Sequence, residues 1–230
     1  IDNLPFYAEM KNIPNREISL MSDWNVKMNA IINATKNEDV GSLTGVPSWM
    51  LVVLNKLLAE TGKNYLDELW PNLEVFFHGG ISFKPYAENY NLITQKKLNY
   101  FELYNASEGF FGIQDQLNSK DLLLLLDNGI FYEFIPMEEF GSETQRFLTI
   151  GEVEVGKNYA MVITTNGGLW RYIIGDTVRF TSTNPHRIVV SGRTKHYINA
   201  FGEELMIENA EEALKRACMQ TNSIVSEYSA

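Results

Sequence analysis

The sequence has few of the residues that build disulfides and metal clusters, since its 230 residues include one cysteine and three histidines. Cys218 has no partner for an internal disulfide, and in a late helical segment we expect it to be a small buried side chain. The histidines, His78, His186 and His196, are scattered and lack the short spacings of zinc ligands. The composition therefore excludes a disulfide scaffold and a cysteine-based metal cluster.

Long apolar runs and an excess of basic residues are also lacking. The run Leu122 to Leu126 is far shorter than the roughly twenty residues of a membrane span, and the start at Ile1 shows no basic or apolar leader. A formal net charge of -10 and a pI near 4.8 oppose binding to a nucleic-acid duplex. We therefore expect a cytoplasmic protein with no membrane or nucleic-acid partner. Because it begins with Ile rather than Met, we also expect it to be part of a longer chain.

Apolar residues recurring at three- and four-residue steps predict two helices in the first third of the chain. One covers Arg16 to Thr35, and the other begins at Pro47 and ends at Gly62. Trp49 and Met50 are expected to pack in the core, and the family resemblance set out below implies a place lining a ligand pocket as the alternative. With 45% hydrophobic residues, the chain can bury a sizeable core, as one large domain or as a domain with part of another.

Short runs rich in β-branched and aromatic residues predict that the strands lie mainly in the second half. Tight-turn signals at Asp127-Asn128-Gly129 and Asn166-Gly167-Gly168 predict two hairpins. Helices alternating with strands early and hairpins later favour an α/β fold with mixed β-sheets and packed helices, rather than an all-parallel doubly wound sheet. The predicted strands are Leu73 to Phe77, Tyr100 to Tyr104, Phe110 to Ile113, Leu122 to Leu126, Ile130 to Ile135, Tyr159 to Thr165, Leu169 to Ile174, Val178 to Thr181 and Ile188 to Val190.

One short run, Tyr104-Asn105-Ala106-Ser107-Glu108-Gly109, combines an aromatic ring, a hydroxyl and a carboxylate at the end of a predicted strand. An aromatic face can stack on a purine, and a hydroxyl can donate to a phosphate oxygen. A carboxylate suits Mg²⁺, which prefers oxygen ligands. The run therefore favours a nucleotide and metal site, although a plain strand end with a capping serine has the same spacing.

A second run, Leu169 to Asp176, is predicted to be a strand that stops at a Gly-Asp turn. The two runs in this order resemble the Tyr-Ala-Ser-Ser-Glu and Tyr-Arg-Val-Gly-Asp motifs of adenylate-forming enzymes, and most closely those of the auxin-responsive acyl acid amido synthetases of plants and their bacterial relatives. Trp70-Pro71-Asn72 and Gly79-Gly80 precede the first run as comparable segments do in that family. The resemblance extends from about Trp70 to Glu212 and implies part of the family's large N-terminal domain.

That resemblance implies ATP or AMP and Mg²⁺ as cofactors, with a carboxylic acid and an amino acid or another amine as substrates. Tyr104 would stack on adenine, and Ser107 would contact the α-phosphate or the acyl carbonyl. Glu108 would hold Mg²⁺. Asp176 would accept from the ribose hydroxyls, and the segment Gly79-Gly80-Ile81 would lie against the adenine.

The resemblance further implies a hinge near Arg193, which divides the chain into 1–192, part of the large domain, and 193–230, the start of a truncated C-terminal domain. Arg193 and Lys195 could reach the ribose or the phosphates, although a solvated basic hinge is an equal alternative. A helix is predicted from Met206 to about Cys218, with acidic residues near its start and basic residues near its end.

Three features depart from the family pattern. The arginine that should follow the tyrosine of the second motif is Ile173, and Arg171 stands on the other side of Tyr172 as a substitute. The Ser/Thr/Gly-rich phosphate loop and the late catalytic lysine are not found in the sequence. We therefore expect the chain to be inactive alone. An acyl-CoA ligase, a non-catalytic nucleotide- or acyl-ligand-binding module and a purely structural domain stay open as alternatives, and neither the substrate nor the oligomeric state is specified.

Overall fold

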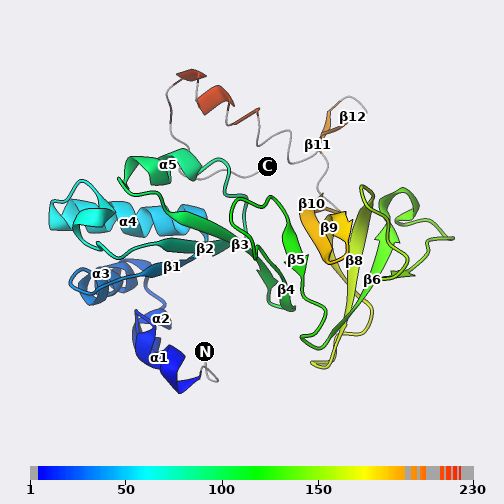
Figure 1. The fold of residues 1–230 in the computed structure, drawn as a ribbon, viewed down its shortest axis with the longest axis horizontal. Coiled ribbons are helices and arrows are strands. Elements are labelled where there is room, and N and C mark those ends of the chain that lie inside the picture. The colour runs from blue at the N-terminus through cyan, green and yellow to red at the C-terminus, as the bar shows by residue number, and fades with distance from the viewer. Residues whose placement is uncertain are drawn as a thin grey trace. The chain divides into compact units, whose positions relative to one another are not determined.

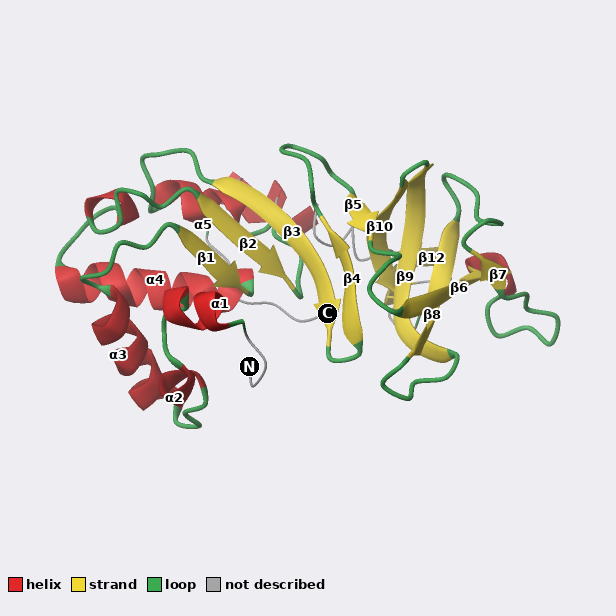
Figure 2. Cartoon of the chain, turned by 60° about the horizontal axis from the view of Figure 1, so that its bottom comes forward, coloured by secondary structure: helices red, strands yellow, loops and turns green. Residues whose placement is uncertain are grey.

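The computed structural model describes residues 5–194, 198–200, 203–205, 213–214, 216–218, 220–221 and 223. It divides into two compact units, which we call the helical unit (Ile1–Phe77 with Tyr86–Tyr100) and the sheet unit (His78–Pro85 with Phe101–Ala230). Figures 1 and 2 show the labelled helices α1 to α5 gathered in the first and most of the strands in the second. The predicted mixed α/β class is confirmed.

Two of the N-terminal helices occupy the segment predicted as one. The single helix over Arg16 to Thr35 is wrong, because Asn15 and Asp23 each begin a separate helix by accepting a backbone N–H with the side chain. The elements of the helical unit are α1 (Phe6–Lys11), α2 (Arg16–Ser19), α3 (Trp24–Thr35), β1 (Ser42–Gly45), α4 (Pro47–Thr61), a 3₁₀ turn (Leu66–Glu68), the start of β2 (Val75–Gly79) and α5 (Ala87–Leu92).

Helix α4 agrees with the predicted bounds. Pro47 occupies the first turn, and Gly62 ends the helix in the left-handed conformation with φ 67°. Its buried stripe includes Leu51, Leu54 and Leu58. Trp49 lies off this stripe and is 59% exposed, so its predicted place in the core is wrong.

The core of the helical unit is fixed by buried aromatic side chains with polar ends. The indole Nε1 of Trp70 donates to the carbonyl of Thr35 at 3.1 Å. The hydroxyl of Tyr90 donates to the carbonyl of Pro47 at 2.8 Å, while its ring stacks on Phe76. Trp70, quoted above as part of a family motif, therefore has a structural role in this unit.

In the sheet unit, the strands from β3 onward form the order β3-β4-β5-β10-β9-β8-β6-β7. Each neighbouring pair in this order is antiparallel. Their bounds are β3 (Asn99–Ala106), β4 (Gly109–Ile113), β5 (Leu122–Leu124), β6 (Ile130–Pro136), β7 (Leu148–Thr149), β8 (Asn158–Thr165), β9 (Tyr172–Thr183) and β10 (His186–Arg193), with a 3₁₀ turn at Met137–Glu139. Strands β11 (Ile198–Ala200) and β12 (Glu203–Leu205) pair separately.

One predicted hairpin is confirmed and the other is wrong. The turn Asn166 to Gly168 joins β8 to its neighbour β9. The chain bends at Asp127 to Gly129, but the strands on either side do not pair with each other. β5 lies between β4 and β10, whereas β6 lies between β8 and β7, because longer-range pairing determines the order.

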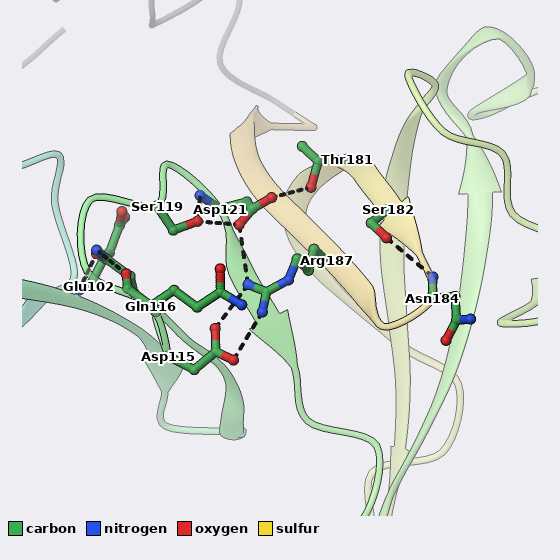
Figure 3. Close-up of polar contacts among 10 residues, drawn as sticks. Glu102, Asp115, Gln116, Ser119, Asp121, Thr181, Ser182, Asn184 and Arg187 are labelled. Carbon is green, nitrogen blue, oxygen red and sulfur yellow. Dashed lines mark hydrogen bonds and ion pairs between the residues drawn. The ribbon is translucent and has the colours of Figure 1, made fainter.

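The buried side chain of Arg187 pairs with two carboxylates and ties β10 to the connection between β4 and β5. Figure 3 shows Asp115 and Asp121 turned toward the guanidinium of Arg187, which is 8% exposed. Arg187 Nη1 lies 2.9 Å from Asp115 Oδ1 and 3.3 Å from Asp121 Oδ1. The hydroxyl of Thr181 on β9 donates to Asp121 at 2.7 Å. The long 114–121 connection is therefore anchored to the sheet.

Several predictions fall at or beyond the edge of the described residues. Lys195 and most of the helix predicted from Met206 to Cys218 lie outside them. The predicted division between residues 192 and 193 stays a prediction. No helix in the described part of the chain has the length and hydropathy that crossing a membrane would require.

Candidate functional site

The two motifs meet in the sheet unit through a direct hydrogen bond. Tyr104, near the end of β3, donates its hydroxyl to Oδ2 of Asp176 on β9 at 2.8 Å, although the residues are 72 positions apart. The bond brings together one residue from each of the segments that the sequence singled out. Folding therefore brings the two motifs into direct contact.

Asp176 is placed by an irregularity within β9. The strand was predicted to stop at Gly175-Asp176, which is wrong, because it continues to Thr183. Val162 of β8 pairs with Ile173 and Ala160 with Thr177, so three β9 residues lie opposite one residue of β8. Gly175, with φ 90°, permits this bulge. The bulge turns a regular strand position into one where the carboxylate of Asp176 stays half-buried.

Arg193 comes opposite Asp176 through a second bulge, in β10. Val190 pairs with Val178 and Gly192 with Thr177, so Ser191 is the extra residue. Its hydroxyl lies 3.0 Å from that of Thr177, and both side chains are buried. Beyond the bulge, Arg193 Nε lies 3.0 Å from Asp176 Oδ1. A regular register would instead have placed Gly192 opposite Asp176.

The hydroxyl and carboxylate of the first motif lie at the turn between β3 and β4. Ser107 is exposed and Glu108 is half-buried. The hydroxyl of Tyr172 donates to Glu108 Oε1 at 3.5 Å, and Tyr172 is 41% exposed. Tyr172 was not among the predicted site residues, although its place in the second motif, four positions before Asp176, was a usable signal.

The glycine pair lies against the end of β3 for a steric reason. A Cβ on Gly79 would come 2.3 Å from the carbonyl oxygen of Leu103 and 3.3 Å from Asn105 Oδ1, so no larger residue fits there without movement. Gly80 has φ 83°, and Ile81 is 38% exposed. This loop therefore runs directly beside the strand that carries Tyr104.

Arg171 points its charge to a different partner. Its Nε and Nη2 donate to the two carboxylate oxygens of Glu133 on β6 at 2.9 and 2.8 Å. The guanidinium also lies 4.0 Å from the ring centroid of Phe147. Among the predicted site residues that the structure describes, Arg171 is thus the one engaged in a separate ion pair, which weakens its candidacy for a ligand contact.

Burial controls the protonation of two groups in this region. Burial, together with the neighbouring Asp176 carboxylate, raises the pKa of Tyr104 far above its ordinary value, so its hydroxyl remains a donor. Burial lowers the pKa of His78 to about 4, which leaves the imidazole neutral at pH 7. His78 stacks on Phe83 and directly precedes Gly79.

The acidic groups suit a metal only in one mode of binding. Within the described ranges, no three or more His, Cys, Asp or Glu side chains gather closely enough to hold a cation. Glu108 therefore fits Mg²⁺ as a single carboxylate, with substrate phosphates and water completing the oxygen shell, which is a common arrangement for this ion.

Comparison with known families identifies two matching segments. The model described as the GH3 family N-terminal domain matches residues 2–98, and that of the GH3 family central domain matches 123–193. The chain belongs to the GH3 family. The second match contains Asp176 and Arg193, so the bulged strands of the site fall within the family's central domain.

Similar curated proteins are named as amido or amino acid synthetases. The indole-3-acetic acid-amido synthetase GH3.4 of Arabidopsis thaliana is 30% identical over 168 residues, covering 67% of this chain and 26% of the relative. The jasmonoyl-L-amino acid synthetase GH3.5 of Oryza sativa subsp. japonica is 34% identical over 140 residues, covering 52% and 24%. The chain thus spans about a quarter of the length of these relatives.

Solved structures support the fold. The GH3.15 acyl acid amido synthetase matches with a TM-score of 0.68 and 17% identity, over 93% of this chain and 47% of that one. A 2-hydroxyisobutyryl-CoA ligase, in complex with an adenylate, matches with a TM-score of 0.62 and 15% identity, over 85% and 41%. The GH3 chain therefore shares its fold with part of two adenylate-forming enzymes.

Proposed function

We propose that this chain carries the adenosine- and metal-binding part of an ATP-dependent acyl acid amido synthetase. The observation that supports this most is the contact between Tyr104 and Asp176, one from each motif, with Arg193 of β10 paired to the same carboxylate. The names of the similar GH3 relatives support the reaction class. The cytoplasmic location remains part of the same proposal.

The proposed reaction has two steps. A carboxylate oxygen of the acyl acid attacks the α-phosphorus of ATP, and pyrophosphate leaves. An amine nitrogen then attacks the acyl carbonyl carbon, the bond to the phosphate oxygen breaks, and AMP leaves with that electron pair while the amine loses a proton. Neither step requires a protein nucleophile, so the residues act by positioning and by offsetting charge.

The proposed roles combine the chemistry of each side chain with the family resemblance. Asp176 accepts hydrogen bonds from the ribose hydroxyls, with Arg193 beside it. The exposed hydroxyl of Ser107 donates to the α-phosphate or the acyl carbonyl. The loop at Gly79 lies along the adenine, and Glu108 supplies the carboxylate for Mg²⁺, which offsets charge on the phosphates.

Binding of AMP to the chain tests this assignment. Isothermal titration calorimetry should detect AMP binding, and Asp176→Asn should weaken it by about tenfold, because the charged acceptor is lost. Glu143→Gln, an exposed change elsewhere in the sheet unit, is the matched control and should bind like the unaltered chain. Absence of AMP binding by the folded chain would contradict the proposal.

The metal role needs its own measurement. Added Mg²⁺ should strengthen ATP binding to the unaltered chain and have little effect on ATP binding to Glu108→Gln. An equal effect of Mg²⁺ on both would remove Glu108 from this role. AMP binding should differ little between the two proteins, because Glu108 is assigned to the phosphate-bound metal rather than to the adenosine.

The chain by itself is expected to bind nucleotide without adenylating a carboxylate, because its 230 residues contain no Ser/Thr/Gly-rich loop to cradle the triphosphate. A pyrophosphate-release assay with a panel of carboxylic acids measures this. Turnover at the rate of a longer protein containing this chain would refute the expectation.

The molecule that accepts the acyl group distinguishes this proposal from an acyl-CoA ligase, the alternative suggested by the shared fold. In such a longer protein, AMP formation in the presence of an acyl acid should depend on an amino acid. Dependence on coenzyme A instead would favour the ligase.

A further inference from the structure

The two hairpins that carry the motifs are joined in the sheet by one short strand. The hairpin of β3 and β4 carries the first motif, and the hairpin of β9 and β10 carries Asp176 and Arg193. Between them lies β5, which is three residues long and pairs with β4 at two positions and with β10 at two. Because β9 and β10 pair with each other at seven positions, the strand pairing holds this hairpin together better than it holds the two hairpins to each other.

The side chain of Arg187 adds a second connection between the hairpins. Arg187 lies on β10 opposite Leu123 of β5, and its guanidinium meets the connection that follows β4 (Figure 3). Its Nη1 and Nη2 each lie 2.9 Å from a different oxygen of Asp115, which is the strong two-bond arrangement of this ion pair. Nη1 also donates to Asp121, the residue directly before β5, at 3.3 Å. One side chain therefore binds the 114–121 connection near both of its ends.

The same connection is bound to strands on either side of it. The side-chain oxygen of Gln114 accepts the backbone N–H of Glu102 on β3 at 3.1 Å, and the backbone N–H of Gln114 donates to the carbonyl of Glu102 at 2.8 Å. On the other side, the hydroxyl of Thr181 on β9 donates to Asp121 at 2.7 Å. Polar contacts therefore run from β3, through the connection, to β9 and β10.

These contacts lie at the opposite end of the strands from the proposed site. Along β10, Arg187 stands six positions before Arg193, which corresponds to about 20 Å of extended strand. Along β9, Thr181 follows Asp176 by five positions. At the site end, the hairpins meet through the hydrogen bond from Tyr104 to Asp176. One attachment at each end prevents the hairpins from pivoting about a single contact.

We infer that Arg187 is a positioning residue that fixes the spacing between the two motif-carrying hairpins by binding the 114–121 connection. The inference rests on the proposed nucleotide site and deepens it, because a nucleotide that contacts Asp176 with its ribose and Ser107 with its phosphate touches both hairpins. A ligand that meets two halves already aligned does not have to order them, so less of its binding free energy is lost.

Calorimetric titration with AMP tests this role. Arg187→Met removes the guanidinium and should weaken AMP binding by about fivefold or more, because the nucleotide must then order the two hairpins itself. Ile135→Ala is the matched control, since it removes a fully buried side chain from β6, a strand that does not pair with β4, β5 or β10. This control destabilises the same unit, and its AMP affinity should stay within about twofold of that of the unaltered chain.

A double variant separates positioning from a loss of stability. In an Asp176→Asn background the nucleotide has lost its charged contact with β9, so Arg187→Met should weaken AMP binding there by less than about twofold. Two distant substitutions with independent effects would instead multiply, and the loss of about fivefold would persist. Urea unfolding of each variant shows that binding is measured on the folded chain.

A milder variant keeps the inference testable if Arg187→Met does not fold. Asp115→Asn retains the shape of the side chain and removes its charge, so it should weaken AMP binding by about threefold, and by less in the Asp176→Asn background.

The outcomes also distinguish this inference from the proposed function. If the unaltered chain binds AMP and the folded variant binds it equally well, or loses the same factor in both backgrounds, the inference fails while the nucleotide site stands. If the unaltered chain does not bind AMP, the proposed function fails and the inference with it.

Discussion

Acidification should destabilise the sheet unit through His78, because its buried imidazole resists protonation in the folded chain. His78 is 4% exposed and stacks on Phe83 with the ring centroids 4.4 Å apart. Burial lowers its pKa from 6.5 to about 4. The unfolded chain therefore takes up a proton at a higher pH than the folded chain does. The contribution to stability is complete above the unfolded value and is lost as the pH falls from about 6.5 toward about 4.

The size of this effect follows from the gap between the two pKa values. Each tenfold change in protonation is worth about 1.4 kcal/mol, so the gap from 6.5 to about 4 is worth roughly 3 kcal/mol in full. At about pH 4.5, most of this, roughly 2 to 3 kcal/mol, should already be lost. That is a large share of the free energy of unfolding of an ordinary domain, about 5 to 15 kcal/mol.

Urea unfolding followed by circular dichroism, at about pH 7 and about pH 4.5, measures the loss. His78→Phe keeps a ring beside Phe83 and cannot titrate, so it should lose roughly 2 to 3 kcal/mol less than the unaltered chain between these values. His186→Gln should behave like the unaltered chain. The carboxylates contribute equally to the pH dependence of the unfolding free energy in all three proteins. For Asp115, a hydrogen bond from Arg187 lowers the pKa below its usual 3.8, so that contribution is lost only at still lower pH.

Two results would refute this reasoning. One is an equal loss of stability in the unaltered chain and in His78→Phe. The other is an NMR titration in which the imidazole of His78 has a pKa near the ordinary 6.5, since the folded and unfolded chains would then take up the proton together.

Three further outcomes are expected. Gly79→Ala should cost about 2 to 3 kcal/mol in urea unfolding, because its Cβ would lie 2.3 Å from the carbonyl oxygen of Leu103, whereas the exposed Gly151→Ala should cost less than about 0.5 kcal/mol; equal costs would contradict the steric argument. Arg187→Met should cost about 2 to 4 kcal/mol near neutral pH by leaving two carboxylates without their cation, and less once acid protonates them. Arg171→Gln should change AMP affinity by less than about twofold by calorimetry, because its guanidinium is held on β6, and a tenfold loss would restore it as a ligand contact.

Local signals in the sequence were sufficient to predict a helix boundary where that boundary depends only on residues close in sequence. Pro47 and Gly62 bound α4 because each favours one backbone conformation, independent of the rest of the chain. The break between α2 and α3 was missed, although Asn15 and Asp23 are both strong N-cap residues. The apolar spacing across the break remained close to helical, and this hid the two caps.

Sheet order and side-chain exposure depend on partners that the sequence does not reveal. The turn at Asp127 to Gly129 has the composition of a hairpin, but whether its two strands pair is decided by β4, β10 and β8. In the same way, the motif singled out Tyr104, but its burial depends on Phe111 and its hydrogen bond on Asp176. Neither of these contacts could be predicted from the motif.

The site depends on departures from regular strand geometry, and this explains why a strand end was predicted where a strand continues. Gly175 and Asp176 resemble a turn because they occupy a bulge, in which a glycine at φ 90° lets the chain bend without leaving the sheet. The extra residue Ser191 then shifts β10 by one position, so that Arg193 rather than Gly192 lies opposite Asp176. An antiparallel pair without these bulges would hold the same residues in the same order and leave the carboxylate without its cation. The arrangement of the site is therefore determined by how β9 pairs with β8 and β10. In the motif, the only sign of this pairing is the glycine that permits the bulge.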